Sequence, residues 1–288
     1  MALPAAIRML RPRQWLKNLF VLAPAFFAGR ILEREPFLRA LAAAALFSLL
    51  SSAAYLFNDI LDVEKDRLRP AKRNRPLAAG EIGPRPAAVA AALLAAASLA
   101  GAAFLSVPLA AAMGAYALLN VLYSLGLKKV ALLDVLIISS GFLLRLYGGA
   151  AAIPVPLSNW IMLTTFFLTL FLGFCKRWTE YHGEGREARD SLREYTPQML
   201  SVFIGMSGVL AISSYALYVI RADSLGGRGG LNLLTTVPLV LLGLFRYVMV
   251  VFRDGGEGDV SEILVKDRFL AAVVVLWIAL TGYFYLAS

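Results

Sequence analysis

Apolar stretches of about 20 residues recur along almost the whole chain and constrain its fold more than any other feature. A helix of about that length crosses the roughly 30 Å of hydrocarbon in a bilayer. Of the 288 residues, 59% are apolar and 16% are charged, whereas roughly 25% are charged in soluble proteins. A single core cannot bury so much apolar surface, because most residues of a domain this size keep some exposure. The composition therefore excludes a soluble globular protein and predicts an all-α, polytopic membrane protein.

Nine apolar stretches are long enough to be considered, and we expect nine transmembrane helices. They lie near residues 17–32, 37–57, 86–106, 108–126, 132–153, 157–175, 198–220, 233–252 and 268–287. The first is the weakest, because it is short and contains Pro24. Several stretches are separated only by proline or glycine, so merging two of them would give eight.

Basic residues predict how these helices are oriented. With a cytoplasmic N-terminus and nine spans, 21 of the 28 lysines and arginines lie on the cytoplasmic side and five on the other. This asymmetry follows the positive-inside rule and places the C-terminus outside. Most acidic residues lie on the same cytoplasmic side, which the rule does not require. The long inside loops are therefore the candidate functional surface.

Charge and the rare residue types exclude several kinds of site. The formal net charge of +9 favours an anionic substrate over nucleic acid, because no soluble part remains to carry a nucleic-acid-binding domain. The single cysteine, Cys175, excludes a disulfide framework, an iron–sulfur cluster and a cysteine-built zinc site. We expect Cys175 in an apolar core and the single histidine, His182, in solvent, where it is too isolated for transition-metal chemistry.

Acidic residues cluster directly after the second span, in the segment NDILDVEKD from Asn58 to Asp66. On a continuous helix at about 100° per residue, Asp59, Asp62 and Asp66 share one stripe about 60° wide. Aligned like charges repel unless a cation lies between them. Oxygen donors without sulfur or imidazole select a hard ion such as Mg²⁺. We therefore predict that Asn58, Asp59, Asp62 and Asp66 bind Mg²⁺.

Basic residues follow these acids within nine positions. They are Arg67, Arg69, Lys72, Arg73 and Arg75, interrupted by Pro70 and Pro76, which favour turns over continued helix. Arginine presents forked donors to phosphate oxygens, and lysine presents a point charge. Carboxylates beside bases are expected at a site for a Mg²⁺–diphosphate substrate. Two alternatives stay open: positive-inside flanking for the bases, and a solvated helix end whose acids pair with Lys65 and Arg67.

Further polar candidates lie in a second loop and inside one span. After the sixth span, Lys176 and Glu180 are i, i+4 neighbours, for which an ordinary ion pair is the alternative to substrate binding. Gly183 and Gly185 interrupt the helix beyond them, so we expect this loop to close over substrate. Arg145 lies in an apolar span and needs a partner, with Asp134 or the acidic stripe as candidates.

The complete set of expected site residues combines these segments. We expect Asp59, Asp62 and Asp66 to be catalytic, and Lys17, Asn18, Arg69, Lys72, Arg73, Arg75, Tyr123, Lys128, Arg145, Lys176, Arg177, Glu180 and Arg189 to bind substrate.

Several of these segments resemble the UbiA superfamily of intramembrane prenyltransferases, and most closely its decaprenyl-phosphate phosphoribosyltransferase branch. The motif that carries the resemblance is Asn58-Asp59-x-x-Asp62-x-x-x-Asp66 on the second span. The supporting segments are RPRQWLKN at 11–18, the stretch 58–80, SGFLLR at 140–145, Lys176-Arg177 with Glu180, and 189–195.

The resemblance implies a single all-helical domain over residues 1–288, in which nine transmembrane helices surround a central cavity. Loops 58–85 and 176–197 would form a cap over the active site, on the cytoplasmic side of a bacterial-type inner membrane. The donor would be phosphoribosyl diphosphate, and the acceptor would be a polyprenyl phosphate lipid that leads to a cell-wall precursor. Asn58, Asp59, Asp62 and Asp66 would hold the Mg²⁺–diphosphate, and Lys17, Arg73, Lys176 and Arg189 would contact phosphates.

One departure from the superfamily pattern bears on the donor. Aromatic prenyltransferases carry a second pair of aspartates after the sixth span, where this chain has Lys176, Arg177, Glu180 and Glu184. Basic residues at this place suit a donor that brings an additional phosphate. Two other interpretations stay open: a prenyltransferase that moves a polyprenyl group to an aromatic or other acceptor, and a transporter or non-catalytic membrane scaffold.

Overall fold

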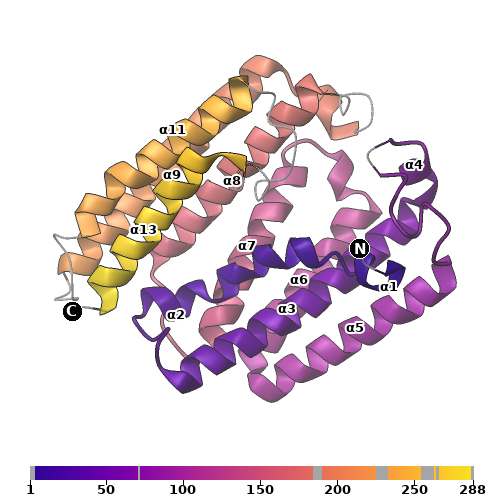
Figure 1. The fold of residues 1–288 in the computed structure, drawn as a ribbon, viewed down its shortest axis with the longest axis horizontal. Coiled ribbons are helices and arrows are strands. Elements are labelled where there is room, and N and C mark those ends of the chain that lie inside the picture. The colour runs from indigo at the N-terminus through magenta and orange to yellow at the C-terminus, as the bar shows by residue number, and fades with distance from the viewer. Residues whose placement is uncertain are drawn as a thin grey trace. The chain divides into compact units, whose positions relative to one another are not determined.

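The structure, a computed structural model, describes residues 4–70, 72–183, 190–224, 233–253, 263 and 266–286. In this part of the chain every regular element is a helix (Figure 1), so the predicted all-α class is confirmed. The elements, with η for 3₁₀ helices, are α1 (Ala5–Arg8), η1 (Pro12–Val21), α2 (Ala23–Phe27), α3 (Arg34–Leu61), α4 (Val63–Arg67), α5 (Pro84–Leu105), α6 (Val107–Leu125), η2 (Leu127–Lys129), α7 (Leu133–Ala152), α8 (Asn159–His182), η3 (Asp190–Glu194), α9 (Pro197–Ser224), η4 (Leu234–Thr236), α11 (Val237–Arg253) and α13 (Arg268–Leu286).

Eight helical segments in the described ranges are long and apolar enough to cross a membrane. They correspond to the second to ninth predicted spans, and the chain is a multi-span membrane protein. The first predicted span, 17–32, is not one long helix but the end of η1, the five residues of α2 and a turn at Gly29 with φ +69°. Pro24 has no amide hydrogen, so an α-helical ladder cannot continue through it from η1. The predicted count of nine continuous helices is therefore not confirmed.

The chain divides into two compact units. The first contains η1, α3, α5, α6 and residues 144–156 from the end of α7. Helix α3 is its centre, since it packs against η1, α5 and α6, and α3 and α5 lie side by side in Figure 1. Phe47 and Leu50 of α3 are almost fully buried with Met113 and Tyr116 of α6.

A close backbone approach holds η1 against the end of α7 in this first unit. A Cβ atom at Gly149 would lie 2.1 Å from the carbonyl oxygen of Val21. Only a residue without a side chain allows this approach. Trp15 Nε1 also donates to Ser52 Oγ at 3.0 Å, and Asn18 Nδ2 donates to Ser48 Oγ at 2.9 Å, which fixes η1 to α3.

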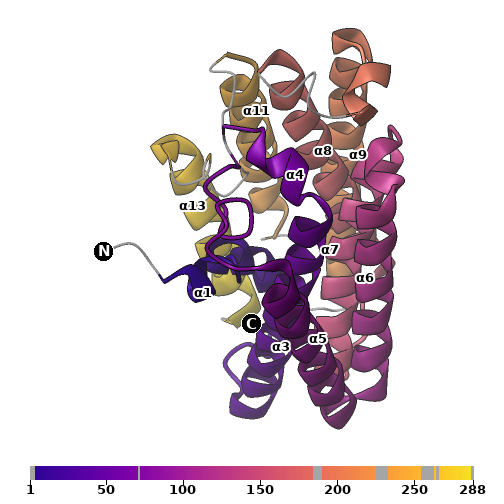
Figure 2. The same cartoon turned by 90° about the vertical axis from the view of Figure 1, so that its right-hand side faces the viewer.

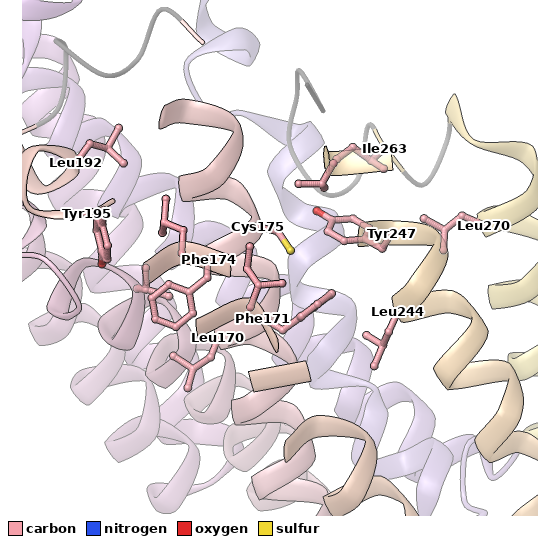
Figure 3. Packing of buried hydrophobic residues seen from close by; sticks show 14 residues of the cluster. Leu170, Phe171, Phe174, Cys175, Leu192, Tyr195, Leu244, Tyr247, Ile263 and Leu270 are labelled. Atoms are coloured by element: carbon pink, nitrogen blue, oxygen red, sulfur yellow. The ribbon is translucent and has the colours of Figure 1, made fainter. Parts of the chain in front are cut away.

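The second unit contains residues 129–143 at the start of α7, together with α8, α9, α11 and α13. Helices α8 and α9 run alongside each other (Figure 2), and α11 packs against α13. Its core includes Phe171, Phe174, Cys175 and Tyr247 (Figure 3). Cys175 is fully buried, which confirms its expected place in an apolar core, and His182 is exposed as expected.

An ion pair fixes the beginning of α13 to α11 in the second unit. Arg246 Nη2 donates to Asp267 Oδ2 at 2.6 Å, and the carboxylate also accepts from the backbone N–H of Leu270 at 2.7 Å. The hydrogen bond from Arg246, and then the one from Leu270, hold the pKa of Asp267 below its usual value. Asp267 therefore caps α13 as a carboxylate.

We predict that Gly149→Ala lowers the free energy of unfolding by about 1–3 kcal/mol, because the new methyl group must push the Val21 carbonyl away. Gly114→Ala in α6 is the control, since nothing lies within 4 Å of a Cβ atom there. Chemical unfolding of the detergent-solubilised protein, followed by tryptophan fluorescence, measures both changes. Equal stability of the two variants would contradict the close approach.

Candidate active site

The acidic motif lies where α3 ends. Asn58 and Asp59 belong to the last turn of α3, and Asp66 belongs to α4. Asp62 lies between the two helices with φ −101° and ψ 7°, outside helical geometry. The expected stripe on one continuous helix is therefore wrong, because the helix breaks at Asp62.

Asp59 and Asp66 share one arginine. Arg75 Nη1 donates to Asp59 Oδ1 at 3.0 Å and also to Asp66 Oδ2. Lys72 Nζ lies 3.6 Å from Asp66 Oδ1. Asp59 and Asp66 are only 4% and 2% exposed, and carboxylates at such depth require cationic partners.

Asp62 and Asn58 share a lysine instead. Lys128 Nζ of η2 donates to Asp62 Oδ2 at 2.5 Å and to Asn58 Oδ1 at 3.0 Å. The four residues predicted to bind Mg²⁺ thus form two pairs, each around a cationic nitrogen. The sequence predicts Lys72, Arg75 and Lys128 at the site, and the structure brings all three to the acids.

Arg11 is a member of this cluster that sequence analysis missed. Its Nη2 donates to both oxygens of Asp59, at 2.7 Å for Oδ2, and its guanidinium lies 5.1 Å from the centre of the Tyr55 ring. In the sequence it counted only as a flanking positive charge. Its place in the RPRQWLKN segment was the one available signal.

The cluster carries more positive than negative charge. Four bases (Arg11, Lys72, Arg75 and Lys128) surround three carboxylates. Burial, and then the neighbouring Arg75, lower the pKa of Lys72. An excess of cationic donors at one place is suited to an anion with several oxygens, such as a phosphate group.

The donor set also fits a hard divalent cation, although not in the arrangement expected. Among the described residues, no three acidic, histidine or cysteine side chains converge where they could hold one metal ion. The oxygen donors converge in pairs, and the nitrogen of Arg75 or Lys128 lies between them as a cation would. Carboxylate and amide oxygens are the ligands that Mg²⁺ prefers. Mg²⁺ would therefore replace bases that now neutralise the acids.

From the sequence, pairing of the motif's acids with Lys65 and Arg67 stayed open. The structure pairs Arg67 with Glu64 instead. Arg67 Nη1 donates to Glu64 Oε1 at 2.9 Å, and both side chains are largely exposed. Glu64 thus has a partner of its own at the surface, apart from the buried acids.

Arg145 lies in a buried polar cluster of the first unit and is 5% exposed. Its Nε donates to Asn18 Oδ1 at 2.7 Å, and its Nη2 donates to the hydroxyl of Tyr116 at 2.8 Å. The guanidinium also lies 4.5 Å from the centre of the Tyr116 ring. Two expected site residues, Asn18 and Arg145, are thus brought together by η1 and α7.

The remaining expected residues of the first unit lie at various depths. Lys17, Arg69 and Tyr123 are half-buried, and Arg73 is exposed. Their contacts with substrate stay predictions.

In the second unit, Arg177 is buried between two acids. Its Nη1 donates to Glu180 Oε2 at 2.5 Å, and its Nε lies 3.6 Å from Asp134 Oδ2. The Arg177 and Asp134 side chains are 1% and 0% exposed. Lys176 and Glu180 are half-buried on the same helix, and Arg189 lies outside the described residues.

Asp134 connects Arg177 to the end of the second loop. It accepts hydrogen bonds from Ser191 Oγ at 3.0 Å and from the Tyr195 hydroxyl at 3.1 Å. Burial, and then the charge of Asp134, raise the pKa of Tyr195 above its usual value. The neutral phenol therefore holds the end of this loop against the start of α7.

Comparison with known proteins shows the family to which this chain belongs. The model of the UbiA prenyltransferase family matches residues 18–262. The chain belongs to the UbiA prenyltransferase family. Within this UbiA family, it is 36% identical over 284 residues to a decaprenyl-phosphate phosphoribosyltransferase of Mycobacterium tuberculosis, which covers 96% of this chain and 92% of that one. A protein of the same name from Corynebacterium glutamicum is 34% identical, over 94% of this chain and 84% of its own length.

A solved structure has the same fold. It is a UbiA homolog from Archaeoglobus fulgidus bound to GPP and Mg²⁺, with a TM-score of 0.76 and 20% identity. The match covers 99% of this chain and 100% of that one. The all-helical architecture is therefore the UbiA fold.

We predict that Arg177→Met lowers the free energy of unfolding by about 3–5 kcal/mol, because it leaves Asp134 buried without its cation. The double variant Arg177→Met/Asp134→Leu should recover much of this loss, since it removes both charges. Chemical unfolding of the three proteins measures the coupling. Additive losses in the double variant would show that the two side chains do not stabilise each other.

Proposed function

We propose that the protein transfers the 5-phosphoribosyl group from phosphoribosyl diphosphate to a polyprenyl phosphate and releases diphosphate. The observation that carries this proposal is the 36% identity, over 96% of the chain, to a relative named for decaprenyl phosphate and phosphoribosyl transfer. The geometry supports it, because four bases beside buried carboxylates suit a metal-bound diphosphate.

Under this proposal, Asn58, Asp59, Asp62 and Asp66 hold Mg²⁺, which stabilises the negative charge on the departing diphosphate. Lys72, Arg75 and Lys128, which now contact the acids, turn to the phosphate oxygens. Arg69, Arg73 and Lys17 would make further contacts with the phosphates. The bond between the anomeric carbon and the diphosphate oxygen breaks, and an oxygen of the lipid phosphate forms the new bond to that carbon.

A strong general base is not required for this reaction, because a phosphate monoester is already anionic. The bases would offset repulsion between two anionic substrates and hold the reacting atoms together. Asn18, Tyr123 and Arg145 would also bind substrate. Lys176, Arg177, Glu180 and Arg189 would do the same, with loops 58–85 and 176–197 as a cap.

We further propose that the site faces the cytoplasm of a bacterial-type inner membrane, with the C-terminus outside. The positive-inside pattern needs an odd number of crossings, so the first segment must cross as well.

We predict that the purified protein with Mg²⁺ transfers label from phosphoribosyl diphosphate to polyprenyl phosphate, and that chelation of Mg²⁺ stops the transfer.

The second candidate function is transfer of a polyprenyl group from its diphosphate to an aromatic or other acceptor. It is favoured by the likeness to a structure bound to GPP and Mg²⁺. Labelled polyprenyl diphosphate therefore serves as the competing donor, and incorporation from it alone would contradict the phosphoribosyl proposal.

We predict that Asp62→Asn lowers turnover by about a hundredfold or more, because loss of an electrostatic ligand to the leaving group costs about that much. Glu64→Gln is the matched control, since Glu64 lies two positions away, is exposed and pairs with Arg67. Turnover and membrane insertion are measured for both. Full turnover by Asp62→Asn would contradict the role of Asp62 as a ligand of the metal-bound diphosphate.

A further inference from the structure

Arg11 has an unusual backbone conformation beside the acidic motif. Its φ of 53° and ψ of 59° are left-handed, and the next residue is Pro12. Left-handed geometry is unfavourable for a residue with a side chain, and a following proline restricts the backbone further towards extended conformations. Other interactions must therefore hold Arg11 in this state.

The flanking segment is anchored on both sides of Arg11. Ser52 Oγ donates to the Leu10 carbonyl at 2.8 Å, and Trp15 Nε1 donates to the same hydroxyl at 3.0 Å. These contacts bring the strained residue to the end of α3. The guanidinium then bonds both oxygens of Asp59 and lies over the Tyr55 ring.

Asp59 already has another cation. Arg75 Nη1 lies 3.0 Å from the Asp59 oxygen Oδ1, to which Arg11 also donates. Arg11 thus occupies both oxygens of a carboxylate that Arg75 also contacts. Arg11 Nη2 donates to both oxygens of Asp59, and Arg75 donates to one of them, so a metal ion that binds Asp59 must compete with cationic side chains already in contact with these oxygens.

Arg11 is also more accessible than the carboxylate it covers. The side chain of Arg11 is 22% exposed, and that of Asp59 is 5% exposed. Arg11 can therefore leave towards solvent, whereas Asp59 stays in place on α3.

We propose that Arg11 is the exchangeable counter-ion of Asp59: it neutralises the carboxylate in the metal-free protein and is displaced when the divalent cation binds. This inference rests on the metal site of the proposed function. It assigns Arg11 a role as a competitor of the metal ion, which the sequence motif did not indicate. Arg11 and the metal ion compete for the same two oxygens.

The test measures Mn²⁺ binding to the full-length protein in detergent, without substrate, by the EPR signal of free Mn²⁺. We expect Arg11→Gln to bind Mn²⁺ about tenfold more tightly. This is the gain expected if the form with Arg11 on Asp59 makes up about nine-tenths of the metal-free protein, because only the remaining tenth can bind the ion. Arg11→Lys keeps the charge on a shorter side chain and should lie between the two. Arg8→Gln is the matched control, because Arg8 lies on the same segment but pairs with Glu81, and its Mn²⁺ affinity should equal that of the unchanged protein.

Three outcomes would overturn the inference: Mn²⁺ affinity unchanged in Arg11→Gln, Mn²⁺ affinity lowered in it, or no Mn²⁺ binding by either protein. Size-exclusion elution and tryptophan fluorescence establish that each variant is folded. The donor assay separates this inference from the proposed function. Labelled lipid with unchanged Mn²⁺ affinity would refute Arg11 alone, and tighter Mn²⁺ binding without labelled lipid would refute the phosphoribosyl reaction alone.

Discussion

Neutralising three carboxylates at the end of α3 is the requirement on which the local structure of the first unit depends. Asp59 and Asp66 are almost fully buried, where an unpaired charge is strongly destabilising. Their partners come from three separate segments: Arg11 before η1, Lys72 and Arg75 after α4, and Lys128 in η2. The ion pairs therefore join the N-terminal segment, the turn after α4, and η2 to the end of α3 and to α4.

Buried ion pairs are also found in purely structural clusters. The pairing of every carboxylate in the motif therefore does not by itself indicate an active site. Two features favour an active site. The bases exceed the acids, and burial next to Arg75 lowers the pKa of Lys72, so the cluster favours an added anion. Membership of the UbiA family makes a metal-bound diphosphate the natural anion to propose. The same bases would then serve as counter-ions before the substrate binds and as phosphate ligands afterwards.

Eight spans were predictable from the sequence because uninterrupted apolar runs favour helices, both for burial in lipid and for backbone hydrogen bonding. The first span was expected at 17–32, but its broken form was not predictable, because the 3₁₀ geometry of η1 and the turn at Gly29 depend on local backbone angles. The break at Asp62 depends on local backbone angles, so the motif divides into pairs where a single stripe was expected. Arg11 was missed because its contact with Asp59, 48 positions away, is tertiary.

The most direct measurement is a structure of the full chain with Mn²⁺ and pyrophosphate, in which anomalous scattering locates the metal. We predict Mn²⁺ at about 2.0–2.6 Å from oxygens of the Asn58–Asp66 motif, the distance at which oxygen ligands hold hard cations. Arg75 and Lys128 should then contact pyrophosphate oxygens instead of the carboxylates. A metal bound elsewhere, or Arg75 still placed between Asp59 and Asp66 with pyrophosphate present, would contradict the exchange of partners on which the account depends.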